Sequence, residues 1–493
     1  MFIPAPRQSV MCKAGRLGVL VVVIAALAAC QTNPATGSRQ FNLMSMEQEI
    51  QLGREADADI TRQMGLYDDA ELQRYVSDLG QELAAETEFP DLPWTFKVID
   101  DDTVNAFALP GGYIYVTRGI LAHFNSEAQL AGVLGHELGH VTGRHGSSRV
   151  TRAQMAELGL GLAIVLQPEL ERFAPLAGTG MQLLFLSFSR THEHEADELG
   201  VRYMARSGYN PEALIDVMET LRRVSDAGGG GRIPEWLSTH PHPENRQEEI
   251  QKHINALDPQ PYRDDRRDEY LERLDGMIYG ENPREGYVRG DTFYHPDLRF
   301  RFDVPSGWSV INQRQAVIAV NRNNGSALQL TLSGENSADS AARRFFGLEE
   351  IEADGSSRTR INGLQAVTGE FSVQTQQGRL DGRAAFIEYD GNVYQLIGYG
   401  DAAEWDTNRG RVDRSIRSFR ELTDRRALDV EPKRLDIAQS DRTSSLREFY
   451  SRYYDGGGAA VSLDEIARLN QLQPESTVEA GMLVKMVTGG EGL

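Results

Sequence analysis

The sequence predicts an α+β protein in three parts: a mostly helical domain with a small sheet, a sandwich-like α/β domain, and a small C-terminal module. Three observations predict this organisation. Apolar residues recur mainly at helical spacing through the first 260 residues. After a charged segment, stretches of alternating apolar and polar residues, which are typical of strands, dominate. The final 60 residues return to short helical and strand patterns, and a length of 493 residues allows two to four domains.

The first 29 residues predict a signal peptide. Basic residues precede a short apolar run that ends in Leu-Ala-Ala-Cys30, which resembles a bacterial lipobox. We therefore expect cleavage before Cys30, lipidation of its thiol, and residues 30–44 as a linker to that anchor. By the same resemblance, Gln31 after the cysteine favours the outer membrane. The alternative is an ordinary secretory signal in which the cysteine is a coincidence.

Charge and cysteine content limit the partners of the chain. The formal net charge is −21, which is unfavourable for binding nucleic acid or an anionic lipid surface. The chain has two cysteines, of which Cys12 lies in the predicted signal peptide. We therefore expect no disulfide in the mature protein, although its compartment would allow one.

Residues 136–140, His-Glu-Leu-Gly-His, carry the chemistry of the first domain. A helix is expected to begin at Ser126, because Gln129 three residues later fits a capping box. His136 and His140 then lie one turn apart on one face, so both imidazoles can bind one ion. Neutral imidazole suits Zn²⁺, and the neighbouring carboxylate of Glu137 can act as a general base. The alternative is an amphipathic helix whose histidines bind no metal.

A further ligand is predicted within residues 192–197, which read His-Glu-His-Glu-Ala-Asp. A catalytic zinc keeps three protein ligands and one open position, and we choose Glu193 as the third ligand. Asp197, on the same helix face, is expected to hold the outer ring nitrogen of a ligating histidine. We expect Glu195 to be solvated. The remaining histidines nearby, His123, His145, His192 and His194, are expected to lie outside the set of ligands.

These motifs together resemble the HtpX and CAAX-prenyl-protease family of zinc endopeptidases. The resemblance covers residues 45–262 and also rests on Thr239-His240-Pro241 with Arg246, and on Asn105-Ala-Phe and Pro110-Gly-Gly, which match the family's substrate-side strand. It implies a zincin-type fold, one zinc held by His136, His140 and Glu193, Glu137 as general base, and Arg246 as a support. Within the family, the soluble periplasmic branch that enhances β-barrel assembly is the more similar, although its usual tetratricopeptide tail is missing here.

A short strand is predicted beside the zinc helix, at residues 113–117, after a Gly111-Gly112 turn. An extended peptide can bind by pairing with such a strand, which reads backbone more than side chains. The expected substrate-binding residues of this strand and its approach are Asn105, Gly112, Tyr113, Ile114 and Tyr115.

His240 follows four consecutive glycines at residues 228–231, which predict a mobile loop. From such a loop His240 can act as a fourth zinc ligand that silences the site, or as an imidazolium that stabilises an oxyanion. The family resemblance favours the first, a plug that must move before substrate enters. A histidine that only packs or caps is the third alternative.

The rest of the chain predicts accessory parts. A charged linker is expected at residues 263–288, followed by an α+β domain at residues 289–424 whose pattern is similar to PsbP-type α/β/α sandwiches. Residues 430–493 resemble a LysM module, although the first half fits poorly. Whether this module binds peptidoglycan stays open.

The sequence thus predicts a zinc metalloendopeptidase of the bacterial envelope, held in the periplasm by a lipid anchor. The expected substrates are unfolded or misassembled outer-membrane proteins, and the expected partners are the outer-membrane assembly machinery or peptidoglycan, with no nucleic acid. Two alternatives stay open: an envelope chaperone or assembly factor, and a peptidoglycan-binding scaffold with little proteolysis.

Overall fold

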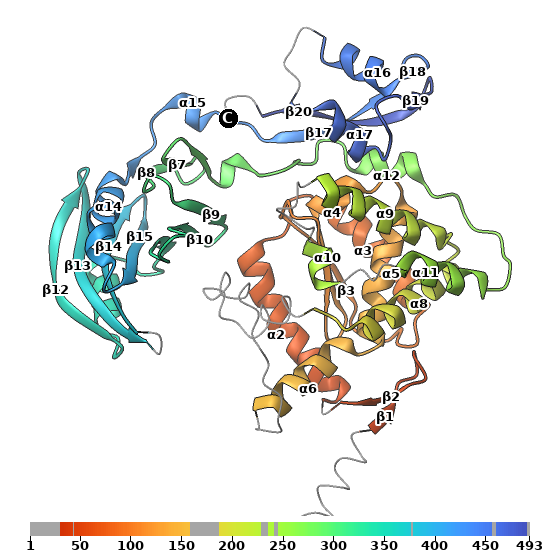
Figure 1. Ribbon diagram of the computed structural model, residues 1–493, viewed down its shortest axis with the longest axis horizontal. Coiled ribbons are helices and arrows are strands. Elements are labelled where there is room, and N and C mark those ends of the chain that lie inside the picture. Colours follow the sequence, from red (N-terminus) through yellow and green to blue (C-terminus); the bar gives the residue numbers. More distant parts are fainter. Residues whose placement is uncertain are drawn as a thin grey trace, which may run out of the picture. The chain divides into compact units, whose positions relative to one another are not determined.

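The computed structural model describes residues 30–42, 44–157, 187–227, 235–240, 245–375, 378–455 and 460–490. The chain forms two compact units (Figure 1). Unit 1 consists of Met1–Met277 and Asp436–Met486, and unit 2 of Ile278–Leu435 and Val487–Leu493. The predicted signal peptide and the four-glycine loop lie outside the described residues. None of the described helices is long and apolar enough to cross a membrane.

Unit 1 begins with a hairpin where we expected a linker. Strands β1 and β2 pair antiparallel, and their side chains bind the end of the histidine-bearing helix. The Asn33 amide donates to the Thr142 carbonyl at 2.8 Å, and the Gln40 amide donates to the Gly143 carbonyl at 2.8 Å. The linker prediction for residues 30–44 is therefore wrong, because these polar side chains satisfy carbonyls at a helix end. The bounds are β1 (Cys30–Thr32) and β2 (Arg39–Phe41).

Two amphipathic helices follow, as their periodicity predicted. Ser45 begins the first with a capping box, and Asp69 caps the second. Their apolar faces bury Ala56 and Ile60 from the first helix and Leu72 and Val76 from the second. The bounds are α2 (Met46–Met64) and α3 (Ala70–Ala85).

The small sheet of unit 1 has the strand order β3-β5-β4. Strand β5 is parallel to β3 and antiparallel to β4, so β5 is the central strand. Gly111 and Gly112 form the turn between β4 and β5 with φ of +81° and +103°, a region that glycine enters without steric cost. The bounds are β3 (Thr95–Ile99), β4 (Ala106–Leu109) and β5 (Tyr113–Thr117).

The other helices of unit 1 surround one buried helix, α5, which packs against α8, α9, α3 and β4. Ser126 caps α5 by accepting a hydrogen bond from the Gln129 amide, as the capping-box pattern predicted. The bounds are α4 (Arg118–His123), α5 (Glu127–Thr142), α6 (His145–Glu157), α8 (Arg190–Arg206), α9 (Glu212–Ala227), α10 (Glu235–Thr239), α11 (Arg246–Asn255) and α12 (Arg267–Arg273).

Helix α12 replaces part of the predicted linker at residues 263–288. Tyr270 is fully buried, and its hydroxyl donates to the Leu121 carbonyl at 2.8 Å. Leu271 and Leu274 are also fully buried. The charged residues of this segment therefore form the outer face of a packed helix, which charge content alone did not distinguish from a linker.

The C-terminal module belongs to unit 1 from residue 436 to residue 486. The Lys485 side chain is fully buried, and its Nζ donates to the carbonyls of Ala122 and Phe124 at 2.7 and 2.9 Å, at the end of α4. The Asn125 amide donates to the Leu469 carbonyl at 3.0 Å. The module is thus docked on the helical domain, and its resemblance to LysM stays a prediction. The bounds are β17 (Lys433–Gln439), which pairs with β20 (Leu483–Gly489), β18 (Ser444–Ser445), which pairs with β19 (Thr477–Val478), α16 (Leu446–Tyr453) and α17 (Leu463–Leu469).

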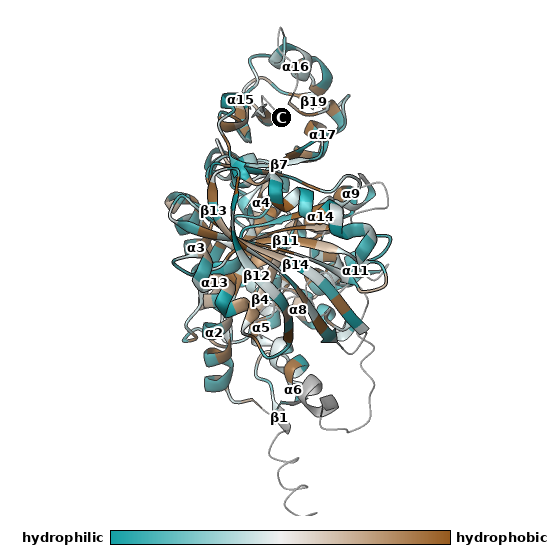
Figure 2. Cartoon of the chain, turned by 90° about the vertical axis from the view of Figure 1, so that its left-hand side faces the viewer, coloured by the Kyte–Doolittle hydropathy of each residue, from teal (hydrophilic) through white to brown (hydrophobic). Residues whose placement is uncertain are grey.

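Unit 2 has two sheets, a seven-stranded one of order β12-β13-β14-β15-β11-β10-β9 and a four-stranded one of order β16-β8-β7-β6. Ala384 and Phe386 of β14 pack with α13, whereas Ala385 and Ile387 pack with α14 and the second sheet. Because successive strand residues point to opposite faces, the large sheet is covered on both sides, as the sandwich prediction expected. Figure 2 shows the apolar colouring along β11. The bounds are η2 (Pro283–Glu285), β6 (Tyr287–Arg289), β7 (Thr292–His295), β8 (Phe300–Asp303), β9 (Ser309–Gln313), β10 (Ala316–Val320), β11 (Ala327–Leu332), α13 (Ala338–Phe346), β12 (Ile351–Ile361), β13 (Leu364–Thr375), β14 (Gly378–Tyr389), β15 (Asn392–Asp401), α14 (Trp405–Ser418), β16 (Arg420–Glu421) and α15 (Arg425–Leu428).

Candidate metal centre

The buried helix α5 and its neighbour α8 bring the predicted metal ligands together. His136 and His140 lie one turn apart on α5, and their Nε2 atoms are 3.0 Å apart. Helix α8 approaches through small residues, because a Cβ on Gly139 would lie 2.8 Å from the carbonyl oxygen of Ala196. This close approach places Glu193 of α8 beside both histidines.

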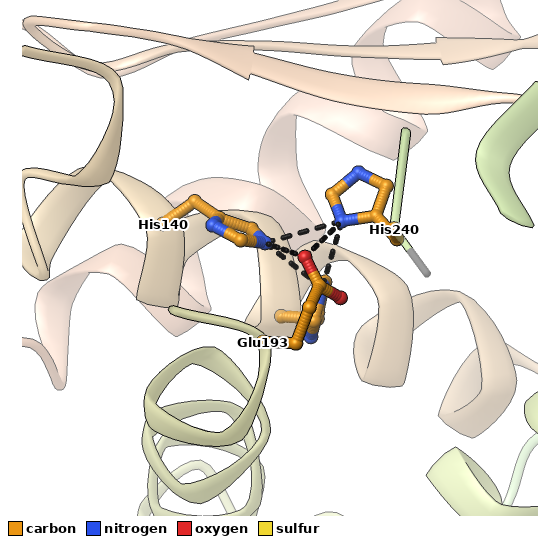
Figure 3. A group of neighbouring side chains, drawn as sticks. His140, Glu193 and His240 are labelled. Carbon is orange, nitrogen blue, oxygen red and sulfur yellow. Dashed lines mark hydrogen bonds and ion pairs between the residues drawn. The ribbon is translucent and has the colours of Figure 1, made fainter. Parts of the chain in front are cut away.

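Four ligand atoms surround one point, as Figure 3 shows for His140, Glu193 and His240. His240 Nδ1 is 3.3 Å from His136 Nε2, 3.2 Å from His140 Nε2 and 3.1 Å from Glu193 Oε1. Glu193 oxygens are 3.4 Å from His140 Nε2 and 3.6 Å from His136 Nε2. A tetrahedron of ligands around zinc, with bonds of about 2.0–2.1 Å, has edges of about 3.3 Å. The spacing therefore fits a tetrahedral zinc.

The tautomer of His136 also indicates a cation. Its Nδ1 is 2.9 Å from Asp197 Oδ1, a carboxylate that accepts a hydrogen bond, so Nδ1 carries the proton. The Nε2 lone pair of His136 then points at the other ligand atoms. A cation among these atoms relieves the repulsion between them. We conclude that the residues present suit a metal ion.

The surrounding charges keep the ligands in their metal-binding forms. Burial lowers the pKa of His140 well below its ordinary value, which keeps the imidazole neutral. Burial alone would raise the pKa of Glu193, but the interactions with the neighbouring His240 and Arg246 side chains outweigh burial, and the pKa lies well below its ordinary value. Arg246 is fully buried and contacts both supporting carboxylates, with Nε and Nη2 donating to Asp197 at 2.7 and 2.8 Å and Nη1 3.1 Å from Glu193 Oε2.

Glu137 is fully buried and contacts Trp236 and His240. The Trp236 indole Nε1 donates to Glu137 Oε1 at 3.1 Å, and His240 Nε2 is 3.6 Å from the same oxygen. Glu137 Oε2 is buried and accepts no hydrogen bond from any residue that the structure describes. Trp236 also stacks on His240, with ring centroids 4.7 Å apart. One short segment, residues 235–240, thus contacts both the metal position and the predicted base; we call it the plug segment.

The predicted substrate strand requires a correction. Tyr113, Ile114 and Tyr115 lie on β5, which pairs with β3 on one side and β4 on the other, and Gly112 lies in the turn before it. A central strand has no free backbone groups, so no peptide can pair there. Among the described residues, β4 pairs with no strand other than β5, and Asn105 directly precedes β4. The sequence pattern showed that both strands exist but could not show which one lies at the edge.

Three further residues of the site were missed or misplaced by sequence reasoning. His145 is fully buried, with its Nδ1 2.9 Å from His140 Nδ1, and its Nε2 is 3.1 Å from Glu195 Oε2. The expectation that Glu195 is solvated holds only in part, because 24% of its side chain is exposed but its carboxylate pairs with His145. The hydrogen bond from His145 lowers the pKa of the Glu195 carboxyl. Trp236 was not predicted at all. In the sequence, the one indication that His145 belongs to the site was its position, five residues after His140 and beyond a glycine.

Comparison with known proteins agrees with this geometry. Residues 70–254 match the model of peptidase family M48, which is a zinc-dependent metallopeptidase family. The chain is 31% identical over 237 residues to the beta-barrel assembly-enhancing protease of Escherichia coli strain K12, covering 46% of this chain and 48% of that protein. It is 34% identical over 230 residues to the mitochondrial metalloendopeptidase OMA1 of Schizosaccharomyces pombe, covering 44% and 65%. The OMA1 of Arabidopsis thaliana is 38% identical over 161 residues, covering 32% and 31%.

These matches have limited extent. The chain spans about half the length of the beta-barrel assembly-enhancing proteases that it matches. Among solved structures, cyanobacterial PsbP from Synechocystis matches with a TM-score of 0.23 and 14% identity, covering 27% of this chain and 94% of that one.

Proposed function

We propose, from the match of residues 70–254 to the model of peptidase family M48, that this protein is a zinc metalloendopeptidase. The observation that carries the proposal is the cluster of His136, His140, Glu193 and His240, whose ligand atoms all lie within 4.8 Å of one another. Glu137 lies on the same helix as two of these ligands, where a general base is needed.

The residues around the cluster have separate roles in hydrolysis. Zinc, when bound, lowers the pKa of water and polarises the scissile carbonyl. Glu137 takes the proton of the attacking water and later delivers it to the leaving amine. Its unpaired Oε2 leaves an acceptor available for that proton. Asp197 and Arg246 hold His136 and Glu193 in place, so that the ligands do not reorganise during the reaction.

We place the substrate on the edge of β4. The Thr117 amide donates to the Asn105 carbonyl at 3.0 Å, so the alternation of an antiparallel pair turns the backbone groups of Ala106 and Ala108 outward. A pocket beside the cluster is lined by Ala108, His140 and Phe188 among others. An extended chain added to β4 would therefore pass the metal position. Recognition through backbone groups favours unfolded or misassembled proteins as substrates.

The plug segment closes the site in this conformation. His240 supplies a fourth ligand, and a zinc with four protein ligands has no open position for water. The Trp236 indole also donates a hydrogen bond to Glu137, the predicted base. The Trp236 amide also donates to the Val104 carbonyl at 3.2 Å, next to the edge where substrate would pair. Activation therefore requires the plug segment to leave, and a substrate strand on β4 would compete with it.

The location and partners extend the proposal beyond the site. Lipidation of Cys30 would hold the protein in the periplasm at the outer membrane, near misassembled outer-membrane proteins and their assembly machinery. Incorporation of labelled fatty acid into the chain, and its loss in Cys30→Ser, tests the anchor. Peptidoglycan binding by the LysM-like module is tested by retention of the full chain on purified peptidoglycan.

Cleavage of casein by the purified full chain tests the central proposal. Zinc content and rate are measured for the wild type, Glu137→Gln and His240→Ala. We expect about one zinc per chain in all three, a higher rate in His240→Ala because an open position appears, and no cleavage in Glu137→Gln. His253→Ala, on α11 outside the cluster, is the matched control and should behave like the wild type.

Two outcomes would redirect the proposal. Bound zinc without cleavage in any variant would favour the chaperone or assembly-factor alternative. Absence of bound metal would mean that the ligand assignment is wrong.

A further inference from the structure

The two helix-borne ligand histidines are supported in different ways. His136 Nδ1 contacts the carboxylate of Asp197 directly, at 2.9 Å. His140 Nδ1 instead faces another imidazole, that of His145, at 2.9 Å. A ligating histidine needs a partner for its outer nitrogen, because that partner fixes the tautomer and the ring orientation. His145 occupies that place for His140.

A single arrangement of protons satisfies the contacts that join His140, His145 and Glu195. If His140 Nε2 faces the metal, Nδ1 carries the proton and donates to His145 Nδ1. His145 then carries its own proton on Nε2, which lies 3.1 Å from Glu195 Oε2. The carboxylate accepts that hydrogen bond and also one from the Ser38 hydroxyl at 3.4 Å. Each ring nitrogen of His140 and His145 then either faces the metal or has a hydrogen-bond partner.

The local backbone is built for this contact. Helix α5 ends at Thr142, and Arg144 adopts a left-handed conformation with φ of +55°, which turns the chain so that α6 begins at His145. A Cβ on Gly143 would lie 2.4 Å from His145 Nε2, so only glycine leaves room for the ring. His192 lies parallel to His145, with ring centroids 4.3 Å apart and planes inclined by 6°. The ring of His145 is thus held on both sides.

We propose that His145 and Glu195 are positioning residues that hold and polarise His140 as a metal ligand, through a carboxylate–imidazole–imidazole chain. The inference rests on the proposed function, because it requires zinc at the cluster. Asp197 contacts His136 directly, whereas Glu195 supports His140 through one additional imidazole, that of His145. Glu195 differs from Asp197 in access, since 24% of its side chain is exposed against 1% for Asp197. The His140 ligand is therefore the one whose support reaches the protein surface.

Zinc affinity of the full chain, measured by competition with a chelator, tests this inference. His145→Phe keeps the ring shape and removes both hydrogen bonds, and we expect zinc to bind about 10- to 100-fold more weakly. Glu195→Gln keeps the size and removes the charge, so we expect a smaller loss. Glu198→Gln on the same helix, whose carboxylate contacts Arg202, is the control and should bind zinc like the wild type.

A second readout separates positioning from a general structural role. The visible absorption of the Co²⁺-substituted protein reports ligand geometry and should change in His145→Phe and Gly143→Ala but not in Glu198→Gln. Unchanged thermal unfolding of the metal-free variants would show that the fold is intact. If His145→Phe fails to fold, the zinc affinity of Glu195→Gln decides.

Wild-type zinc affinity and an unchanged cobalt spectrum in His145→Phe and Glu195→Gln would overturn the inference while leaving the proposed function intact. A wild-type chain that binds no zinc would overturn both. These outcomes distinguish the two failures.

Discussion

The two units bury different kinds of side chain. Unit 1 buries charged and titratable groups around α5, including Glu137, Glu193, Asp197 and Arg246. Among the described residues of unit 2, the buried polar side chains are those of Ser326, Ser372, Asn408 and Ser415, and none of them is charged. Its cores are aromatic and aliphatic on both faces of the large sheet.

This difference shows which unit bears the free-energy cost of buried charges. A buried charge costs several kcal/mol unless a partner compensates it, so a fold retains such groups where pairing or chemistry uses them. Unit 1 therefore places a reactive site in its interior, whereas the described interior of unit 2 is apolar apart from four uncharged polar side chains. The following predictions test that contrast, from the largest expected effect to the smallest.

Glu137→Gln should have the largest effect on activity. The amide keeps the shape of the side chain but cannot accept the proton of water, so the rate of peptide cleavage should fall by about 10²- to 10⁴-fold. Zinc content should stay that of the wild type, because Glu137 is not in the ligand cluster. Substantial cleavage by this variant would show that another group is the base.

Arg246→Met should strongly destabilise unit 1. The substitution leaves the carboxylates of Asp197 and Glu193 buried without their cation, which costs about 3–5 kcal/mol. Zinc affinity should also fall, because Asp197 then no longer holds His136 firmly. Denaturant unfolding of the metal-free chain and chelator competition check both effects, and unchanged values in both would contradict the contrast drawn above.

Phe386→Ala should cost unit 2 a similar amount by a different mechanism. The side chain is fully buried among Phe345 and Phe346, so truncation leaves a cavity that costs about 3–5 kcal/mol. Zinc binding and casein cleavage at a temperature where unit 2 stays folded should remain those of the wild type. Loss of zinc in this variant would mean that the units are not separate in function.

Lys485→Met should have the smallest effect, about 1–3 kcal/mol, since it leaves the carbonyls of Ala122 and Phe124 without their donor. It should also change the pH dependence of stability. Burial and nearby Arg267 lower the pKa of Lys485 well below its ordinary value, so the unfolded chain binds the proton more readily. The contribution of Lys485 to the stability of the wild type should therefore rise with pH up to about 10.4, the unfolded pKa, and fall as pH decreases.

The Lys485→Met variant has no amine at this position, so this pH dependence should be missing from its stability. Unfolding curves of both proteins between pH 7 and 10 check it, and a parallel pH dependence in the two would contradict the prediction.

Local patterns determined much of the fold and part of the site. The His136-Glu-x-x-His140 spacing placed two ligands and a base on one helical face, because the helix repeat is fixed. Ser126 marked the helix start, since its hydroxyl satisfies a free amide. The alternation of apolar and polar residues after residue 289 predicted a sheet-rich domain, and strands such as β10 (Ala316–Val320) and β11 (Ala327–Leu332) lie in it.

Only the tertiary structure decided which of these pieces meet. A repeat shows which face of a strand is apolar but not whether its edges are paired, so the sequence pattern could not distinguish the central strand β5 from the edge strand β4. Charge content did not reveal that Glu195 turns inward to His145, because that depends on the turn at Gly143. The same holds for Lys485, which no local pattern marks as buried. Periodicity fixes the direction of a side chain along its own element, whereas its partner depends on packing between elements distant in sequence.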